Sequence, residues 1–168
     1  MAHYAKIGLN GAVLSTHVVA DEVQLLNGVD NEEMGRAYLE SIHGWPIWKR
    51  FSLNTSRGVH YTDDGNGTRT VSADQSKAFR GNAAGKGGSY DEDNDCFWEP
   101  KPYRDWVKDL STYEWKAPVD FPTTTTFDVG GETRYYNITW DQDNSQWVCL
   151  VNNKKWNHTA DPKVWIDI

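Results

Sequence analysis

Cysteine is scarce in this chain of 168 residues, which contains only Cys96 and Cys149. Two isolated cysteines lack the paired spacing of a structural zinc site and cannot form a multiple-disulfide scaffold. The histidines occur in no H-x-x-x-H or H-E-x-x-H arrangement, and they stand at His3, His17, His43, His60 and His158. We therefore expect no metal site and no cofactor. We interpret both cysteines as reduced thiols that pack as small apolar groups, with a single disulfide between them as the alternative.

Positive charge and long apolar runs are also lacking. The chain has 17 Lys and Arg against 24 Asp and Glu, a net charge of -7, and its basic residues form no dense cluster. Binding to nucleic acid or to anionic membranes depends on such a cluster. No apolar run has the length of a signal peptide or approaches the roughly 20 residues that span a bilayer. We expect a protein that is made in a cytoplasm and binds neither nucleic acid nor membranes.

Recognisable catalytic motifs are lacking as well. Residues 81–86 resemble a phosphate-binding loop, but the glycines are one residue too close together and Gly87 replaces the Ser or Thr that contacts magnesium. The acidic run 91–95 resembles the start of a calcium loop, but Cys96 replaces its glycine and Pro102 replaces its bidentate Glu. We therefore expect no catalytic residue and no enzymatic activity.

Two pairs of β-forming runs predict hairpins in the first part of the chain. Residues 4–9 and 12–19 flank an Asn-Gly pair, which supplies the two positive-φ positions of a type I′ turn. Residues 59–62 and 68–71 flank a Gly-rich loop and predict a second hairpin. The run 45–51 between them is typical of a further strand.

One amphipathic helix is predicted at residues 31–43. Asp30 suits the N-cap position with Glu33 as its capping-box partner, and Gly44 ends the apolar periodicity. The apolar residues at helical spacing are Met34, Ala37, Tyr38 and Ile42. This spacing predicts that they face the core. Residues 1–71 are thus expected to form a small α+β module of hairpins and one covering helix.

A change of composition marks the predicted domain boundary. Residues 72–89 are rich in Ala, Gly, Ser, Lys and Arg, and residues 81–88 contain four glycines. We interpret this segment as a linker or a pinned loop. Residues 90–168 form the second predicted region, with 123–168 as an extension.

Aromatic residues dominate the second region, and the whole chain contains nine tryptophans. An aromatic residue, a polar turn and a second aromatic recur at residues 90–98, 106–115, 140–147 and 156–165. In hairpins of this length the flanking aromatics lie close together across the strands and stabilise small sheets. The predicted fold class is therefore mainly β: an α+β hairpin-and-helix module followed by tryptophan-bracketed β-hairpins.

The tryptophans are also the candidate contact residues. Their faces stack on sugar rings and on other aromatic surfaces. We expect most of the rings to hold the hairpins together and an outward-facing minority to bind a partner, above all in the last two hairpins. The candidates are Trp98, Trp106, Trp115, Trp140, Trp147, Trp156 and Trp165.

Several segments carry a family resemblance: residues 1–7, 74–80, the Gly-rich run into Tyr90 and Asp91, residues 97–109 and residues 115–118. Together they resemble small virion-associated proteins of tailed phages that infect marine cyanobacteria and other marine bacteria. The W-x-A-P step at Trp115 is similar to segments of phage tail-fibre assembly and tail chaperone proteins. The resemblance covers about residues 1–122.

The resemblance implies a non-enzymatic virion structural protein, made in the host bacterial cytoplasm. It would be an accessory or decoration subunit on the tail or capsid surface, oligomeric or assembly-bound, with other phage structural proteins as partners. Short strands and aromatic faces suit such contacts. Two alternatives stay open: a tail-fibre assembly factor or chaperone, and a carbohydrate-binding module that contacts host surface glycans.

Overall fold

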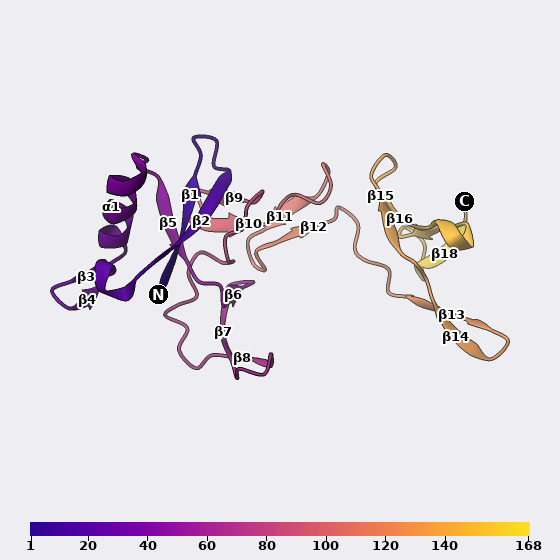
Figure 1. Cartoon of the computed structure of the whole chain (residues 1–168). Coiled ribbons are helices and arrows are strands. Elements are labelled where there is room, and N and C mark those ends of the chain that lie inside the picture. Colours follow the sequence, from indigo (N-terminus) through magenta and orange to yellow (C-terminus); the bar gives the residue numbers. More distant parts are fainter. The chain divides into compact units, whose positions relative to one another are not determined.

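The computed structural model describes residues 1–168 as short antiparallel strands with a single α-helix (Figure 1). The predicted mainly β fold class is confirmed. The chain forms two compact units. The N-terminal unit contains Met1–Lys101 and Lys108–Glu114, and the C-terminal unit contains Pro102–Val107 and Trp115–Ile168. None of the helices has the length and apolar character that crossing a membrane requires.

A three-stranded antiparallel sheet in the order β2-β1-β5 organises the N-terminal unit. β1 (Ala2–Ile7) and β2 (Val13–Val19) form the predicted first hairpin, and β5 (Trp48–Phe51) pairs with the other side of β1. The predicted type I′ turn is wrong, because only Gly11 in the turn has a positive φ, of 78°. The Asn10 side chain instead accepts a hydrogen bond from the N–H two residues later, a local bond typical of Asn in turns.

The only α-helix, α1 (Glu32–His43), ends at the predicted residue but begins one residue later than predicted, at a different cap. Asn31 is the N-cap, and its side chain accepts a hydrogen bond from the backbone N–H two positions later. Asp30, the predicted cap, forms an ion pair with Arg50 of β5 instead. Gly44 ends the helix as predicted, in the left-handed conformation with φ of 60°.

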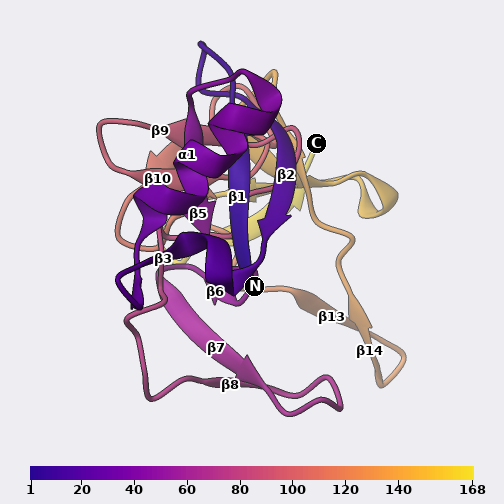
Figure 2. The same cartoon turned by 60° about the vertical axis from the view of Figure 1, so that its left-hand side comes forward.

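The helix presents an unexpected face to the sheet. Its buried residues are Gly35 and Leu39, whereas the predicted core residues Met34, Tyr38 and Ile42 are 37%, 43% and 57% exposed. Gly35 has no side chain, so the helix backbone approaches the Tyr4 ring of β1 closely along this line. The apolar stripe consequently lies on one flank of the helix rather than on the face that contacts the sheet. Figure 2 shows α1 over β1 and β5, with β2 along the edge of the sheet.

The remaining strands of the N-terminal unit are short. β6 (Thr55–Ser56), β7 (Val59–Asp63) and β8 (Arg69–Val71) form a second three-stranded sheet that contains the predicted second hairpin. The other elements are the 3-10 helix η1 (Asp21–Gln24), the paired strands β3 (Leu25–Leu26) and β4 (Val29–Asp30), and the hairpin of β9 (Ser89–Asp91) and β10 (Cys96–Trp98).

The core of the N-terminal unit lies on both faces of the main sheet. On the helix side, Leu39 packs with Tyr4, Val19 and Trp48. On the other side, the buried cluster is formed by Ala5, Ile7, Val13, Phe51, Ala84, Tyr90 and Phe97. The β9–β10 hairpin, predicted to belong to a second region, thus contributes to the first core. It lies beside the main sheet in Figure 1.

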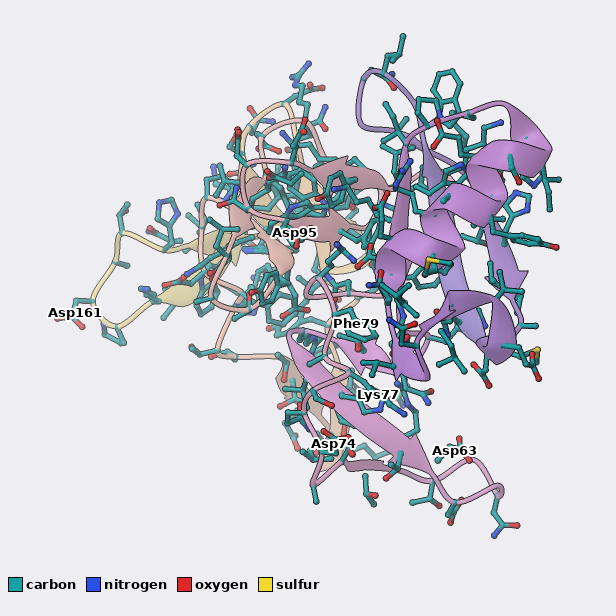
Figure 3. All side chains as sticks on the ribbon, turned by 90° about the vertical axis from the view of Figure 1, so that its left-hand side faces the viewer. Asp63, Asp74, Lys77, Phe79, Asp95 and Asp161 are labelled. Atoms are coloured by element: carbon teal, nitrogen blue, oxygen red, sulfur yellow. The ribbon has the colours of Figure 1, made fainter.

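Residues 72–89 are a pinned loop of the N-terminal unit. The Gly58 N–H donates to the Gly81 carbonyl at 2.7 Å, and the Ala83 N–H donates to the Thr55 carbonyl at 3.0 Å. Phe79, labelled in Figure 3, lies beneath the Arg50 guanidinium, 4.8 Å from its ring centre. The predicted boundary at 72–89 is therefore corrected. The loop bonds to β6 and to the turn that follows it, and the chain first leaves this unit after Lys101.

The C-terminal unit is built on a four-stranded antiparallel sheet in the order β15-β16-β17-β18. Its strands are β15 (Thr139–Asp141), β16 (Gln146–Cys149), β17 (Lys154–Asn157) and β18 (Val164–Asp167), with the 3-10 helix η2 (Leu150–Asn152) between the middle two. A separate hairpin pairs β13 (Thr126–Val129) with β14 (Glu132–Tyr135). β11 (Val107–Asp109) and β12 (Glu114–Lys116) pair where the chain passes between the units.

Candidate contact site

All four predicted aromatic brackets form hairpins. Tyr90 lies opposite Phe97 in the β9–β10 hairpin. The two hairpins of the C-terminal sheet place tryptophans directly opposite each other, Trp140 against Trp147 and Trp156 against Trp165. The bracket at 106–115 corresponds to β11 and β12. Aromatic spacing therefore located these hairpins correctly.

Burial separates the seven candidate tryptophans into two groups. Four are core residues with exposed fractions of 2–7%: Trp98, Trp140, Trp147 and Trp156. The other three are partly buried: Trp106, Trp115 and Trp165. A ring in the first group has too little free surface to contact a partner, so only the second group remains available. Trp98 belongs to the N-terminal unit and the other six belong to the C-terminal unit.

Tryptophan rings form most of the core of the C-terminal unit. The Trp140 and Trp147 ring centres lie 4.9 Å apart at 69°, and Trp106 lies 5.9 Å from Trp147. These edge-to-face geometries are favourable for aromatic pairs. Ala117 and Trp156 are the other buried members of the cluster. The residues that also pack against it are Tyr103, Val119, Ile138 and Trp165. The unit thus replaces the usual aliphatic core by interlocking indoles.

Indole N–H groups fasten the preceding chain to this sheet. Trp147 Nε1 donates to the Val119 carbonyl at 3.0 Å, and Trp140 Nε1 donates to the Asp105 carboxylate at 3.1 Å. Each buried indole N–H that finds a partner avoids the cost of an unsatisfied polar group. These bonds hold the segments before and after the β11–β12 hairpin against the sheet. They thereby position the walls of a pocket.

The pocket has a volume of about 210 Å³. Its lining residues all belong to the C-terminal unit and are Trp106, Trp115, Lys116, Ala117, Val119, Asp120, Phe121 and Trp147. Phe121 is 54% exposed, and its ring packs edge-on against Trp147 with the centres 5.0 Å apart. The side chains of Lys116 and Asp120 are exposed. The rings of Trp106, Trp115 and Phe121, together with the buried Trp147, therefore line an apolar hollow beside one positive and one negative charge.

The motifs that resembled catalytic or metal sites serve structural roles. Asp91 accepts hydrogen bonds from Lys108 and Asn94, and the bond from Lys108 lowers the pKa of Asp91. Asp95, labelled in Figure 3, bonds to Arg80 and to the Tyr90 hydroxyl. No group of three or more metal-ligating side chains is brought together.

The glycine-rich run makes close contacts within the N-terminal unit. The side chain of Asn82 donates to the carbonyls of Phe97 and Tyr113. Gly58 and Gly81 both lie against the Tyr113 ring, which leaves no room for a Cβ at either position. Cys96 and Cys149 are free and buried.

Sequence reasoning missed Phe121 as a site residue. The signal that could have found it is local: Pro118 and Pro122 hold the chain extended on either side of it, and Pro122 is buried. An aromatic residue in an extended segment between two prolines cannot join a hairpin, so its ring is free to face outward. The same segment supplies Lys116, Ala117, Val119 and Asp120.

Comparison with models of protein families, with curated proteins and with solved structures found no match for this chain. The resemblance to phage proteins rests on the sequence segments quoted above.

Proposed function

We propose that this protein is a non-enzymatic virion structural protein of a tailed bacteriophage, an accessory or decoration subunit on the tail or capsid surface that acts through protein–protein contacts. The observation that carries the contact role is the aromatic pocket of the C-terminal unit with the exposed Phe121 ring at its margin. The sequence resemblance supplies the phage setting.

The pocket has the properties of a protein-binding hot spot. Contact energy in protein interfaces concentrates in buried aromatic anchors surrounded by polar residues. Here Trp106, Trp115 and Phe121 provide the apolar centre, and Lys116 and Asp120 provide opposite charges beside it. An apolar side chain of another virion subunit would fill the pocket. The two charges would fix its orientation, since like-charge contacts disfavour other registers.

Peptide mass spectrometry of gradient-purified virions tests the proposal. We expect peptides of this chain in particles, at a copy number that falls in phage carrying Phe121→Ala. The matched control is Tyr135→Ala, because Tyr135 is an exposed aromatic of the same unit, 79% accessible, outside the pocket. If purified particles contain no peptide of the chain, the virion assignment is refuted and an assembly factor or chaperone is favoured. An equal loss with both variants would refute the role of the pocket.

A carbohydrate-binding function is the second candidate, and the composition of the same pocket favours it. Sugar rings stack on indole faces while carboxylates accept hydrogen bonds from their hydroxyls, and Trp115 and Asp120 line this pocket together. Glycan-array binding that is lost in Trp115→Ala and Phe121→Ala but kept in Tyr135→Ala would establish it. Substituting Trp98 or Trp147 would be uninformative, because both rings are in the cores.

A further inference from the structure

The main sheet of the N-terminal unit has one open edge. The Ile7 N–H of β1 donates to the Ile47 carbonyl at 3.0 Å, on the side of β5. Backbone N–H and C=O groups alternate in direction along a strand, so those of Tyr4 and Lys6 point toward β2. His17 lies opposite Tyr4, so the backbone N–H and C=O groups of His17 point toward β1. The N–H and C=O groups of its neighbours Thr16 and Val18 therefore point outward, away from β1. No backbone or side-chain group in the structure bonds to them.

The opposite edge confirms this alternation and is closed. By the same rule the backbone N–H and C=O groups of Arg50 in β5 point outward, and both of them form hydrogen bonds with side chains. Its N–H donates to Glu32 at 3.0 Å, and its carbonyl accepts from Arg80 at 2.7 Å. One edge of the sheet is thus capped by charged residues, as is common for edges that must not pair, whereas the other is not.

The residues of β2 favour pairing. Val13–Val19 reads VLSTHVV, which contains no charged residue and no proline, and Val18 is 54% exposed. Charge and proline are the usual protections of an edge strand. The first residue of β2 is already bonded on its outer side, where the Val13 N–H donates to Gly88. The open part therefore begins after Val13.

We propose that this edge binds the β2 edge of a second copy of the chain, in antiparallel orientation about a two-fold axis at His17. In this register Thr16 of each copy lies opposite Val18 of the other. Thr16 and the Val18 opposite it then form a hydrogen-bonded pair of the new ladder. The N–H and C=O groups of both residues in each copy therefore bond across the interface. The result is a continuous six-stranded sheet with an isologous interface.

Self-pairing is favoured by the apolar surface beside β2. The net charge of -7 opposes association of two copies, but β2 contributes no charged residue to this repulsion at the edge itself. The apolar flank of α1, formed by Met34 and Tyr38 with Ile42, faces the β2 side of the sheet, because the opposite flank is bonded toward β5 through Glu32. A two-fold axis beside β2 turns these two apolar flanks toward each other.

Analytical ultracentrifugation of the purified full-length chain tests this inference, and its outcome is independent of any phage role. We expect a dimer whose dissociation constant rises at least tenfold, roughly, in Thr16→Pro, because each dimer loses two hydrogen bonds while the β1–β2 ladder stays intact. Val18→Lys should also give monomers. Its matched control is Val71→Lys, at a valine 65% exposed on β8, which should stay dimeric. A monomeric wild type, or a dimer that Thr16→Pro leaves unchanged, would overturn the proposal.

The register has its own test. In the proposed arrangement the two copies of His17 form a non-hydrogen-bonded pair, in which Cα atoms lie roughly 4.5 Å apart, a separation that a disulfide can bridge. His17→Cys should yield disulfide-linked dimers under mild oxidation, whereas Val71→Cys should not. The native Cys96 and Cys149 are buried at 1% and 0% exposure and do not compete. Failure of His17→Cys to cross-link a dimeric protein would refute this pairing.

Discussion

Replacing Gly35 by alanine tests the packing of α1 most directly. In an exposed helix this change is stabilising by about 1 kcal/mol, because glycine is a poor helix former. Here a Cβ at Gly35 would lie 2.6 Å from Cζ of Tyr4 and closer still to its hydroxyl. Tyr4 is fully buried, and its single hydroxyl proton is shared between the carbonyl of Glu32 at 3.0 Å and the side-chain oxygen of Gln24 at 3.3 Å.

The expected effect is a net loss of stability. Moving Tyr4 disturbs this shared hydrogen bond, worth about 1 kcal/mol, and overpacks a filled site at about 1–3 kcal/mol. After the helix-propensity gain of about 1 kcal/mol is subtracted, Gly35→Ala should lower the free energy of unfolding of the N-terminal unit by about 1–3 kcal/mol. Urea titration followed by the helical circular dichroism signal measures this, since the only α-helix lies in that unit.

Two controls make the prediction specific. Gly85→Ala should be close to neutral, because no atom lies within 4 Å of its Cβ position and its φ is not positive. The Tyr4→Phe change removes the nearest clashing atom. The double variant should therefore be more stable than the sum of the single effects. If Gly35→Ala equals or exceeds the wild type in stability, the close helix–sheet contact is refuted.

Two further predictions concern the C-terminal core and the acid response. Trp147→Ala should destabilise the C-terminal unit by about 3–5 kcal/mol, because its ring is only 7% exposed. Trp165→Ala should cost less, because that ring is only partly buried. Hydrogen exchange of the β15–β18 amides measures both effects. Burial first, and then the charges of His43 and Lys6, lower the pKa of His17 below its ordinary 6.5. The unfolded chain therefore binds a proton first, so stability is complete above pH 6.5 and falls as the pH drops through 6.5 toward the lower folded pKa. His17→Gln should flatten this part of the profile, and an unchanged profile would refute the assignment.

Local features of the fold were predictable because their causes are local. The pairing of Trp140 with Trp147 is set by the six polar residues between them, of which the middle four form a turn that closes the hairpin whatever the rest of the chain does. The end of α1 at Gly44 has the same origin, since a left-handed residue terminates a helix by itself. Aromatic spacing therefore predicted the hairpins, and the position of a glycine predicted where the helix ends.

Features that depend on distant residues were not predictable. Asp30 fits an N-cap by its own chemistry, but Arg50, twenty positions later, binds it, and Asn31 caps the helix instead. Residues 72–89 have the composition of a linker, yet Ala84 fills the core beneath β1. The helix face was misassigned because hydrophobic periodicity counts Met34 and ignores glycine, whereas the absence of a side chain is what allows close approach.

The candidate site could be predicted only in part for the same reason. Spacing identified Trp106 and Trp115 but did not separate them from the buried Trp140 and Trp147, since all four stand in the same kind of bracket. The separation arises from tertiary packing, which buries Trp140 and Trp147 and leaves Trp106 partly buried at the cluster.

The core and the pocket of the C-terminal unit are one structure, and this decides how its function can be probed. Trp147 packs in the core, lines the pocket and bonds through its indole N–H to Val119 of the pocket wall. Removing it would loosen the wall at the same time as the core. A loss of binding in such a variant would therefore not distinguish a contact residue from a folding residue. Phe121 and Lys116 line the same pocket from exposed positions, so their substitution changes the surface that a partner meets while the indole cluster stays intact.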